Sequence, residues 1–573
     1  MYYKLHMRQH LFSKIEKFKV FCGFIFANDS YILFYLISFS MKTLVKLYVN
    51  RNIFEKMVSY VIQTEISESN VFAMKKDVYF DKIRNWKSYR TVVATFITHL
   101  NSINVGMCQG YSAVLLPQLI SNLNAKTDDT IITVNNNEAS WIAGFGVLLN
   151  PIGALLSGLL IDMMGRKTTI CYTTLPFFFG WTTIGLSNDV YTLCIGRFIS
   201  GLAIGMSSCC YVYVAEISTP SNRGFLSAIG PIFVSLGVLI VYSLGYIINW
   251  KMIAFVCAAT AVITFACTLF LPESPSWLAT NGSLNEATKA LIWFRKDQAS
   301  TDSELADILE AAKISRNSKP RSLKEMFFYC KRGAVWKPFV ILLTFFLFQE
   351  LSGIYVILYY SVDFFRIIGA FNDGFVFSIL VGMLRFLTSI VGAVCIQQFS
   401  RKFMATNSGV LMALSMAAAA TYEYCYSTIQ VDQRPMSWIP LVSILVNVSA
   451  SMLGMLQLPW LMVGELFPLA VRGIMGGIVS SLAYLFIFLS VKFYPTLIET
   501  LRIDGTMWLF SGASILAAIF ALCYLPETKD KSLFQIERAF AKSESGESKE
   551  NLPSSIITQN IPTISVSVER REV

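Results

Sequence analysis

Long apolar runs alternate with short polar segments along most of the chain. A run of about 20 apolar residues is long enough to cross the hydrocarbon core of a bilayer as a helix. Six such runs precede a long polar gap, near 91–119, 140–161, 169–187, 191–213, 225–247 and 252–271. Six follow it, near 339–361, 375–396, 404–424, 438–461, 474–497 and 507–525. The pattern predicts an all-α membrane protein with 12 transmembrane helices in two six-helix bundles.

The composition supports this fold class and excludes others. The chain of 573 residues is 54% hydrophobic and 15% charged, whereas soluble domains carry roughly 25% charged residues. The high hydrophobic content and low charged content also exclude a mainly disordered chain. The net charge is +10, and the basic residues lie mainly in the segments between apolar runs. We therefore expect the chain to interact with the lipid bilayer and not with nucleic acid.

The distribution of basic residues predicts the orientation. Lys and Arg are dense between Leu278 and Lys337 and recur in the short loops on the same side, such as Arg166-Lys167 and Arg401-Lys402. Cytoplasmic loops carry an excess of Lys and Arg, which predicts cytosolic termini and a cytosolic middle segment. The expected organisation is an N-terminal extension, a six-helix bundle, a cytosolic helical linker, a second six-helix bundle and a cytosolic tail, over 1–87, 88–277, 278–337, 338–525 and 526–573.

The extension over 1–87 is the least regular segment. Its apolar stretch Phe21–Phe39 is interrupted by Asn28-Asp-Ser, and each half is too short to span a bilayer. A cytosolic or interfacial extension is therefore favoured over a thirteenth span.

The two bundles share an internal repeat. Glu216 precedes Arg223-Gly224 by the same spacing as Glu465 precedes Arg472-Gly473, an offset of 465 − 216 = 249. Leu271-Pro-Glu-Ser recurs as Leu525-Pro-Glu-Thr, an offset of 525 − 271 = 254. Asp162-Met-Met-Gly-Arg-Lys has a degraded partner in Gln397-Gln-Phe-Ser-Arg-Lys, an offset of 397 − 162 = 235. These matches predict two pseudo-symmetric bundles, the parallel-repeat architecture of major-facilitator transporters.

The motifs also carry a family resemblance. They include Gly110-Tyr-Ser, Asp162-x-x-Gly-Arg-Lys, Gly196-Arg197-Phe, Pro272-Glu-Ser-Pro-Ser-Trp-Leu, Gln349-Glu-Leu-Ser-Gly, Pro459-Trp460 and Pro526-Glu-Thr-Lys-Asp-Lys-Ser. In this order they resemble the sugar-porter family of the major facilitator superfamily across about 88–540, and most closely its insect branch of facilitated trehalose transporters. The resemblance implies a cell-membrane protein that moves a sugar, trehalose or a hexose, by facilitated (uniport) alternating access. It implies no cofactor, no metal and no obligate protein partner.

Charged residues at the cytosolic edge form a predicted gating network. Its members in the two halves are Asp162, Gly165, Arg166, Lys167, Glu216, Arg223 and Glu273, and Arg401, Glu465, Arg472 and Glu527. An ion at the membrane edge is costly unless it is paired or faces water, so we expect ion pairs within each half that form and break as the halves rock. The alternative is that these residues are topology signals and helix caps.

A sugar needs aromatic faces for its C–H surfaces and a few polar groups for its hydroxyls. By alignment with the family motifs, the candidates are Gln349, Glu350, Tyr355, Gln457, Trp460 and Tyr484. Ser352-Gly353 is expected to bend its helix, and Tyr359 and Tyr360 to form an outer gate. For an aromatic taken singly, packing or an interfacial belt is the competing interpretation.

Two ions lie deep in apolar runs, where the family usually has neutral residues. Glu350 stands where it has Gln, and Arg385 where it often has Asn. Each costs at least about 2.5 kcal/mol alone in a membrane, so we expect an ion pair between them. Structural pairing and direct recognition of hydroxyls are both open.

The first apolar run bears on whether transport is coupled to protons. Proton-coupled members carry Asp directly after Gly-Tyr, whereas this chain has Ser112 there and retains Arg197. Facilitated diffusion is therefore favoured. A proton-coupled symporter using Glu350, a non-transporting sugar sensor and a transporter of another small polar solute remain alternatives. No nucleotide fingerprint or metal-spaced His/Cys cluster occurs, so an enzyme is not expected.

Overall fold

The computed structural model describes residues 89–122, 136–219, 222–281, 283–295, 331–368, 374–430, 433–468 and 471–529, with isolated positions between 301 and 325 and between 531 and 540. The extension 1–87, most of the linker after Arg295 and nearly all of the tail lie outside these residues, and so do the expectations stated for them.

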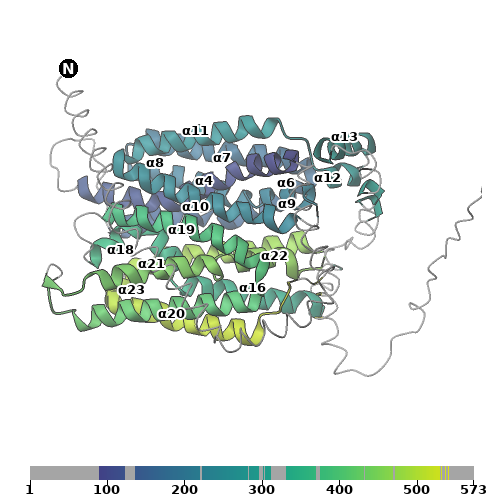
Figure 1. Ribbon diagram of the computed structural model, residues 1–573. Helices are drawn as coiled ribbons and strands as arrows, with labels where there is room; N and C mark the ends of the chain where they lie inside the picture. Colours follow the sequence, from purple (N-terminus) through teal and green to yellow (C-terminus); the bar gives the residue numbers. More distant parts are fainter. Residues whose placement is uncertain are drawn as a thin grey trace, which may run out of the picture.

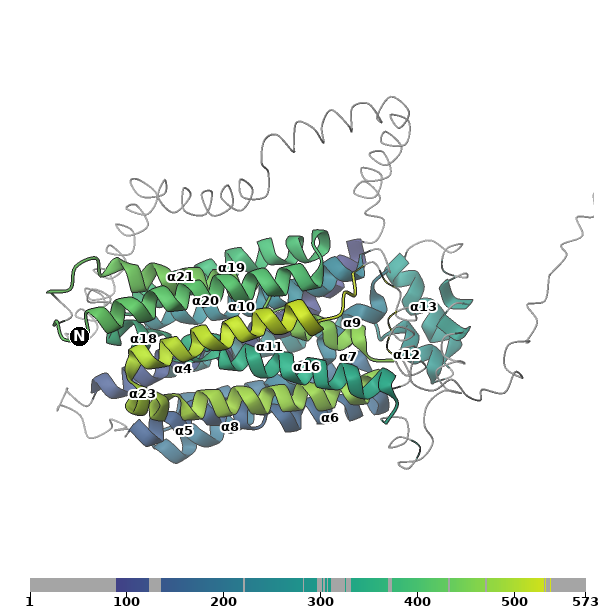
Figure 2. The same cartoon turned by 90° about the horizontal axis from the view of Figure 1, so that it is seen from below.

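The described chain is a bundle of long helices in two halves. The N half contains α4 (Tyr89–Asn122), α5 (Asn136–Leu148), α6 (Asn150–Met164), α7 (Arg166–Leu186), α8 (Val190–Met206), α9 (Cys209–Ile217), α10 (Arg223–Ile247) and α11 (Trp250–Leu269). The C half contains α16 (Gly333–Leu351), α17 (Ile354–Tyr359), α18 (Ser361–Ile367), α19 (Gly374–Gln398), α20 (Arg401–Cys425), α21 (Trp438–Leu453), α22 (Leu458–Leu466) and α23 (Arg472–Tyr524). The two halves lie side by side with their helices along a common direction (Figures 1 and 2).

The helix bounds agree with the expected spans. Within the described residues, nine stretches are long and apolar enough to cross a membrane. One of them, Gly473–Tyr524, contains two spans, because the backbone turns at Arg502 with φ 61° and ψ 177°. The more polar helices α4 and α7 supply the remaining two, at 34 and 21 residues.

Several spans are broken within the bundle. Pro151 lies in the first turn of α6 and separates it from α5, because proline has no N–H and favours a helix start. The expected bend at Ser352-Gly353 is present: Gly353 has φ 77° and separates α16 from α17. A methyl carbon there would lie 2.4 Å from the Phe510 ring, so glycine suits both the backbone angle and the packing.

Two short helices, α12 (Pro275–Thr280) and α13 (Leu284–Arg295), follow the N half. They lie at the end of the bundle where α6 ends and α7 begins (Figure 1). The buried side chain of Arg295 fixes α13 there, with Nη1 donating to the Ile217 carbonyl at 3.0 Å and Nη2 to Glu304 Oε1 at 2.7 Å. We call this the motif end, and the other the opposite end.

Small residues allow the helices to approach closely. At the crossing of α4 and α10, a methyl carbon on Gly106 would lie 2.0 Å from the Val234 carbonyl oxygen, and one on Gly237 would lie 2.2 Å from the Ile103 carbonyl oxygen. Such small-residue crossings are a common basis of helix association in membranes. The halves meet where α10 packs along α19 and where α23 packs along α5 and α6.

Gly106→Ala is expected to destabilise the N half, because the added methyl group must displace the α10 backbone. Overpacking of this kind costs about 1–3 kcal/mol, and thermal unfolding of the detergent-purified protein measures it. Gly158→Ala is the matched control, because a methyl carbon there meets no heavy atom within 4 Å. Equal melting temperatures for the two variants would contradict the tight crossing.

Candidate functional site

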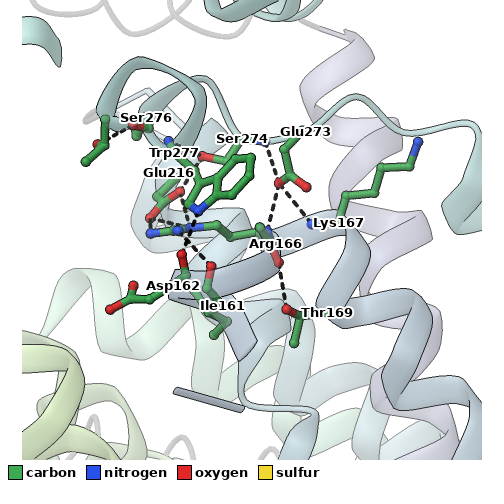
Figure 3. A network of polar contacts seen from close by, with 12 residues as sticks. Ile161, Asp162, Arg166, Lys167, Thr169, Glu216, Glu273, Ser274, Ser276 and Trp277 are labelled. Atoms are coloured by element: carbon green, nitrogen blue, oxygen red, sulfur yellow. Dashed lines mark hydrogen bonds and ion pairs between the residues drawn. The ribbon is translucent and has the colours of Figure 1, made fainter. Parts of the chain in front are cut away.

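At the motif end, the N half contains a compact charged network (Figure 3). Arg166 is the first residue of α7, and its Nη2 and Nε lie 2.7 Å and 2.9 Å from Glu216 Oε1 and Oε2, respectively. Arg166 Nη1 also donates to the Ile161 carbonyl at 3.2 Å, and the Ser274 hydroxyl donates to Glu216. A bidentate arginine–carboxylate contact is among the stronger polar contacts in proteins. It ties α7 to α9 near the ends of both helices.

Glu273 joins the same network through backbone donors. Its Oε1 accepts from the N–H groups of Arg166 at 2.8 Å and Lys167 at 3.0 Å, the first orphan donors of α7. A carboxylate at a helix N-terminus is favoured by these donors and by the helix dipole. Gly165 makes the approach possible: its φ is 94°, and a methyl carbon there would lie 2.5 Å from Glu273 Oε2.

The C half repeats the arrangement. Arg401 Nη2 lies 3.2 Å from Glu465 Oε1, and Glu527 accepts from the N–H groups of Arg401 and Lys402 at 3.1 Å and 3.3 Å. Thr528 donates to Glu465 at 2.5 Å, as Ser274 does to Glu216. Arg401 also donates to the carbonyl of Ile396, as Arg166 does to that of Ile161. The sequence repeat therefore corresponds to equivalent contacts.

The backbone donors also affect the acidity of Glu527. Partial burial by itself would raise the pKa of its carboxyl group, but hydrogen bonds from the N–H groups of Lys529, Arg401 and Lys402 hold that pKa below its ordinary value. Its stabilising contribution is therefore present at neutral pH and is lost as the pH falls through the lowered pKa.

Three further predicted members, Asp162, Arg223 and Arg472, lie at helix ends. The backbone carbonyl of Asp162 accepts from Trp277 Nε1 at 3.2 Å, while its side chain is exposed. Arg223 is exposed at the start of α10 and forms no ion pair with another described residue. Arg472 begins α23, and its side chain lies outside the described residues.

Midway along the bundle, Gln349 links two helices of the C half. The Gln349 side chain is fully buried, and its Nε2 donates to the Leu456 carbonyl at 3.1 Å. That carbonyl lies in the break between α21 and α22, where regular backbone bonding stops. Gln349 Oε1 and Gln457 Nε2 are buried with no hydrogen-bond partner in the structure, so one acceptor and one donor remain in this region.

Aromatic residues border these amides. The rings of Trp460 and Tyr484 have centroids 5.2 Å apart, and Trp460 also makes an edge contact with Phe346 at 4.9 Å. Tyr355 is buried and lies near Glu350, Arg385 and Tyr484. The predicted aromatic residues therefore lie in one region, contributed by α17, α22 and α23.

The expected ion pair between Glu350 and Arg385 is not formed, although both side chains are described and buried. Ser490 donates to Glu350 Oε2 at 3.4 Å, whereas Arg385 Nη2 donates to Gln109 Oε1 at 3.2 Å. Arg385 is thus bonded to a residue of the N half. Proximity of consecutive helices does not determine the direction of a side chain.

The halves are held together at the opposite end. Tyr242 of the N half donates to the Leu358 carbonyl of the C half at 2.6 Å. Tyr359 and Tyr360 follow Leu358, are 2% and 4% exposed, and the Tyr360 hydroxyl donates to the Val491 carbonyl at 3.1 Å. These contacts keep the two tyrosines buried among helices of both halves.

A second contact at this end was not identified from the sequence. Lys492 of α23 donates to Ser140 of α5 at 2.6 Å, and its ammonium group lies 4.2 Å from the centroid of the Trp141 ring. A cation over an indole face is attracted electrostatically. A lysine within an apolar run is the only signal in the sequence that could have indicated this contact.

Arg197 is a buried cation in the N half. Its side chain is fully buried, its Nη2 donates to the Ser112 hydroxyl, and its guanidinium lies 5.6 Å from the centroid of the Tyr111 ring. The position after Gly-Tyr therefore lies beside this arginine, with a hydroxyl group where proton-coupled members carry a carboxylate. Among the described residues, no group of three or more His, Cys, Asp or Glu side chains could hold a metal ion.

Comparison with known proteins places the chain in a family. The family model described as "Sugar (and other) transporter" matches residues 92–540. The facilitated trehalose transporter Tret1 of Drosophila mojavensis is 31% identical over 467 residues, which are 81% of this chain and 53% of that protein. Its namesake in Polypedilum vanderplanki is 30% identical over 452 residues, 78% of this chain and 88% of the relative. The chain spans about half the length of the relatives that it matches in Drosophila mojavensis and Drosophila virilis.

Solved structures agree on the fold. A structure of the proton:xylose symporter XylE bound to 6-bromo-6-deoxy-D-glucose has a TM-score of 0.66 at 21% identity, covering 79% of this chain and 100% of that chain. An inward open conformation of XylE from E. coli has a TM-score of 0.62 at 19% identity, covering 78% and 99%. The fold is the major-facilitator arrangement of twelve helices in two halves. Together with the match over 92–540, it shows that the chain belongs to the sugar (and other) transporter family of the major facilitator superfamily.

Proposed function

We propose that this chain carries a neutral sugar, trehalose or a hexose, across the cell membrane by facilitated diffusion and alternating access. The observation that carries the proposal is the buried central region in which Gln349, Gln457, Trp460 and Tyr484 combine unpaired amide atoms with aromatic faces. Sugar sites need this combination of apolar surface and a few oriented polar groups. The insect relatives named facilitated trehalose transporters support trehalose as the first substrate to test.

The motif end faces the cytosol in this proposal. Arg166, Lys167, Arg401 and Lys402 lie there, and so do α12 and α13, which follow the N half. The positive-inside rule assigns such residues to the cytosolic side. Both termini then lie in the cytosol, and Tyr359 and Tyr360 form the outer gate.

The proposed mechanism uses contacts of two kinds. The Arg166–Glu216 and Arg401–Glu465 pairs lie within single halves at the motif end, whereas Tyr242–Leu358 joins the halves at the outer end. A change of a few kcal/mol in such contacts is enough to shift the equilibrium between two conformations. The two ion pairs contribute to this balance by fixing the helix ends that meet when the cytosolic side closes.

A charged or zwitterionic polar solute is the second candidate substrate. Glu350 Oε1 and two nitrogen atoms of Arg385 are buried with no hydrogen-bond partner in the structure. An acidic and a basic group that do not neutralise each other suit a solute bearing complementary charges. The same acid is the candidate proton site if transport is coupled.

Purified protein in liposomes is expected to take up labelled trehalose or glucose until the inside and outside concentrations are equal, with the same rate in the presence and absence of an inward proton gradient. Accumulation driven by the gradient would contradict facilitated diffusion. Binding without uptake would indicate a sensor. Competition of uptake by amino acids or sugar acids, but not by neutral sugars, would favour the charged solute.

Ser112→Asp is expected to make uptake respond to pH. The introduced carboxylate would lie beside the buried Arg197 guanidinium, where Ser112 now accepts a hydrogen bond, and would add a titratable group inside the N half. Uptake under an inward proton gradient should then exceed uptake without one. Ser112→Asn, which is of similar size and does not titrate, is the control. Indistinguishable pH responses would exclude this position as the determinant of coupling.

Glu216→Gln and Glu465→Gln are each expected to favour the conformation open to the cytosol. Each substitution removes the carboxylate that pairs with an arginine, and the side chains of these arginines are only 12–13% exposed. The KM for sugar entry should rise several-fold relative to the KM for exit, as a loss of about 1 kcal/mol in one state changes the ratio about fivefold. Glu286→Gln, on an exposed position of α13, is the control. An unchanged ratio in both variants would indicate that the networks only cap helices.

A further inference from the structure

Three helices bring a polar side chain of the N half against Arg385. α4 and α10 cross at Gly106 and Gly237 with no room for a further carbon atom, so the position of α4 is fixed by α10. α10 in turn packs on α19, where a methyl carbon on Gly382 would lie 3.1 Å from the Leu239 Cα. One turn beyond Gly106, Gln109 therefore faces α19 across the interface between the halves.

Gln109 is the side-chain hydrogen-bond partner of a deeply buried cation. Its Oε1 accepts from Arg385 Nη2 at 3.2 Å, and the two residues are 8% and 3% exposed. A hydrogen bond to a charged group is worth more than one between neutral groups. A planar guanidinium held at one nitrogen also has a defined orientation, because its five donors are rigidly fixed relative to one another.

The remaining donors of Arg385 are not used by the described protein. Nε and Nη1 are buried with no partner, and the guanidinium lies near Tyr355 and Tyr359. Tyr355 in turn lies near Glu350 and Tyr484. The guanidinium is therefore close to the aromatic groups of the candidate sugar site.

We propose that Gln109 is a positioning residue: it holds the Arg385 guanidinium across the interface so that Nε and Nη1 are presented to hydrogen-bond acceptor oxygens of the substrate. This inference rests on the proposed function. It links substrate affinity to contact between the halves, because Arg385 keeps this orientation only while α4 and α19 are together.

The neutrality of Gln109 is part of the arrangement. A carboxylate at this position would bind Arg385 as an ion pair across the halves, and an ion pair in a low-dielectric interior is strongly attractive. Each transport cycle would then have to separate two charges. An amide oxygen orients the guanidinium without that barrier.

The test is the KM and kcat of sugar exchange in proteoliposomes for Gln109→Met and Gln109→Glu, each made alone and in an Arg385→Gln background. Gln109→Met keeps the size and removes the acceptor, so KM should rise about tenfold. In the Arg385→Gln background, the same change should have no further effect on KM. Gln109→Glu keeps the acceptor, so KM should stay within about threefold while kcat falls.

Gln397→Met is the matched control, because it makes the same change on an exposed position of α19 and should leave both constants unchanged. An unaltered KM in Gln109→Met, or an equal rise with and without Arg385, would overturn the positioning role while the proposed function stands. If Gln109→Met does not fold, a tenfold rise in KM for Gln109→Glu would overturn it. Absence of sugar exchange by the unaltered protein would overturn the proposed function, and the inference with it.

Discussion

Backbone polar groups that enter hydrocarbon must find hydrogen bonds inside the protein, and this constraint shapes the whole bundle. Helices satisfy it where they are regular, so their breaks need side chains. At the break between α21 and α22, the hydroxyl of Ser408 accepts from the Met455 N–H at 3.0 Å, and Gln349 donates to the Leu456 carbonyl. The side chains that hydrogen-bond to the broken backbone therefore lie in the centre of the C half.

The same hydrogen bonds to the broken backbone fix the position of side chains in the candidate site. Because one end of the Gln349 amide is committed to the backbone, its oxygen is left at a defined position beside Gln457 and Trp460. Gly353 allows α17 to turn there and brings Tyr355 into the same region. A broken helix is therefore a source of oriented polar groups in an apolar medium, in agreement with sites at the midplane of transporters.

Spans and repeats could be predicted from the sequence because each is a local property that recurs. Arg166 and Arg401 occupy equivalent positions, and the structure gives them equivalent partners. The partner of Arg385 could not be predicted, because rotation of α19 about its own axis decides whether the side chain meets Glu350 or the other half. Gln109 belongs to no motif, so only the packing of α4 against α10 reveals its contact.

Cations within the membrane-spanning helices also subject the bundle to the membrane potential. Arg385 and Lys492 both belong to the C half and contact residues of the N half, so rocking of one half against the other changes the depth of a charge within the membrane field. Moving one elementary charge across the full field does electrical work of about 2.3 kcal/mol per 100 mV. In the proposed alternating-access cycle, the balance between conformations therefore depends on voltage even when the solute is neutral.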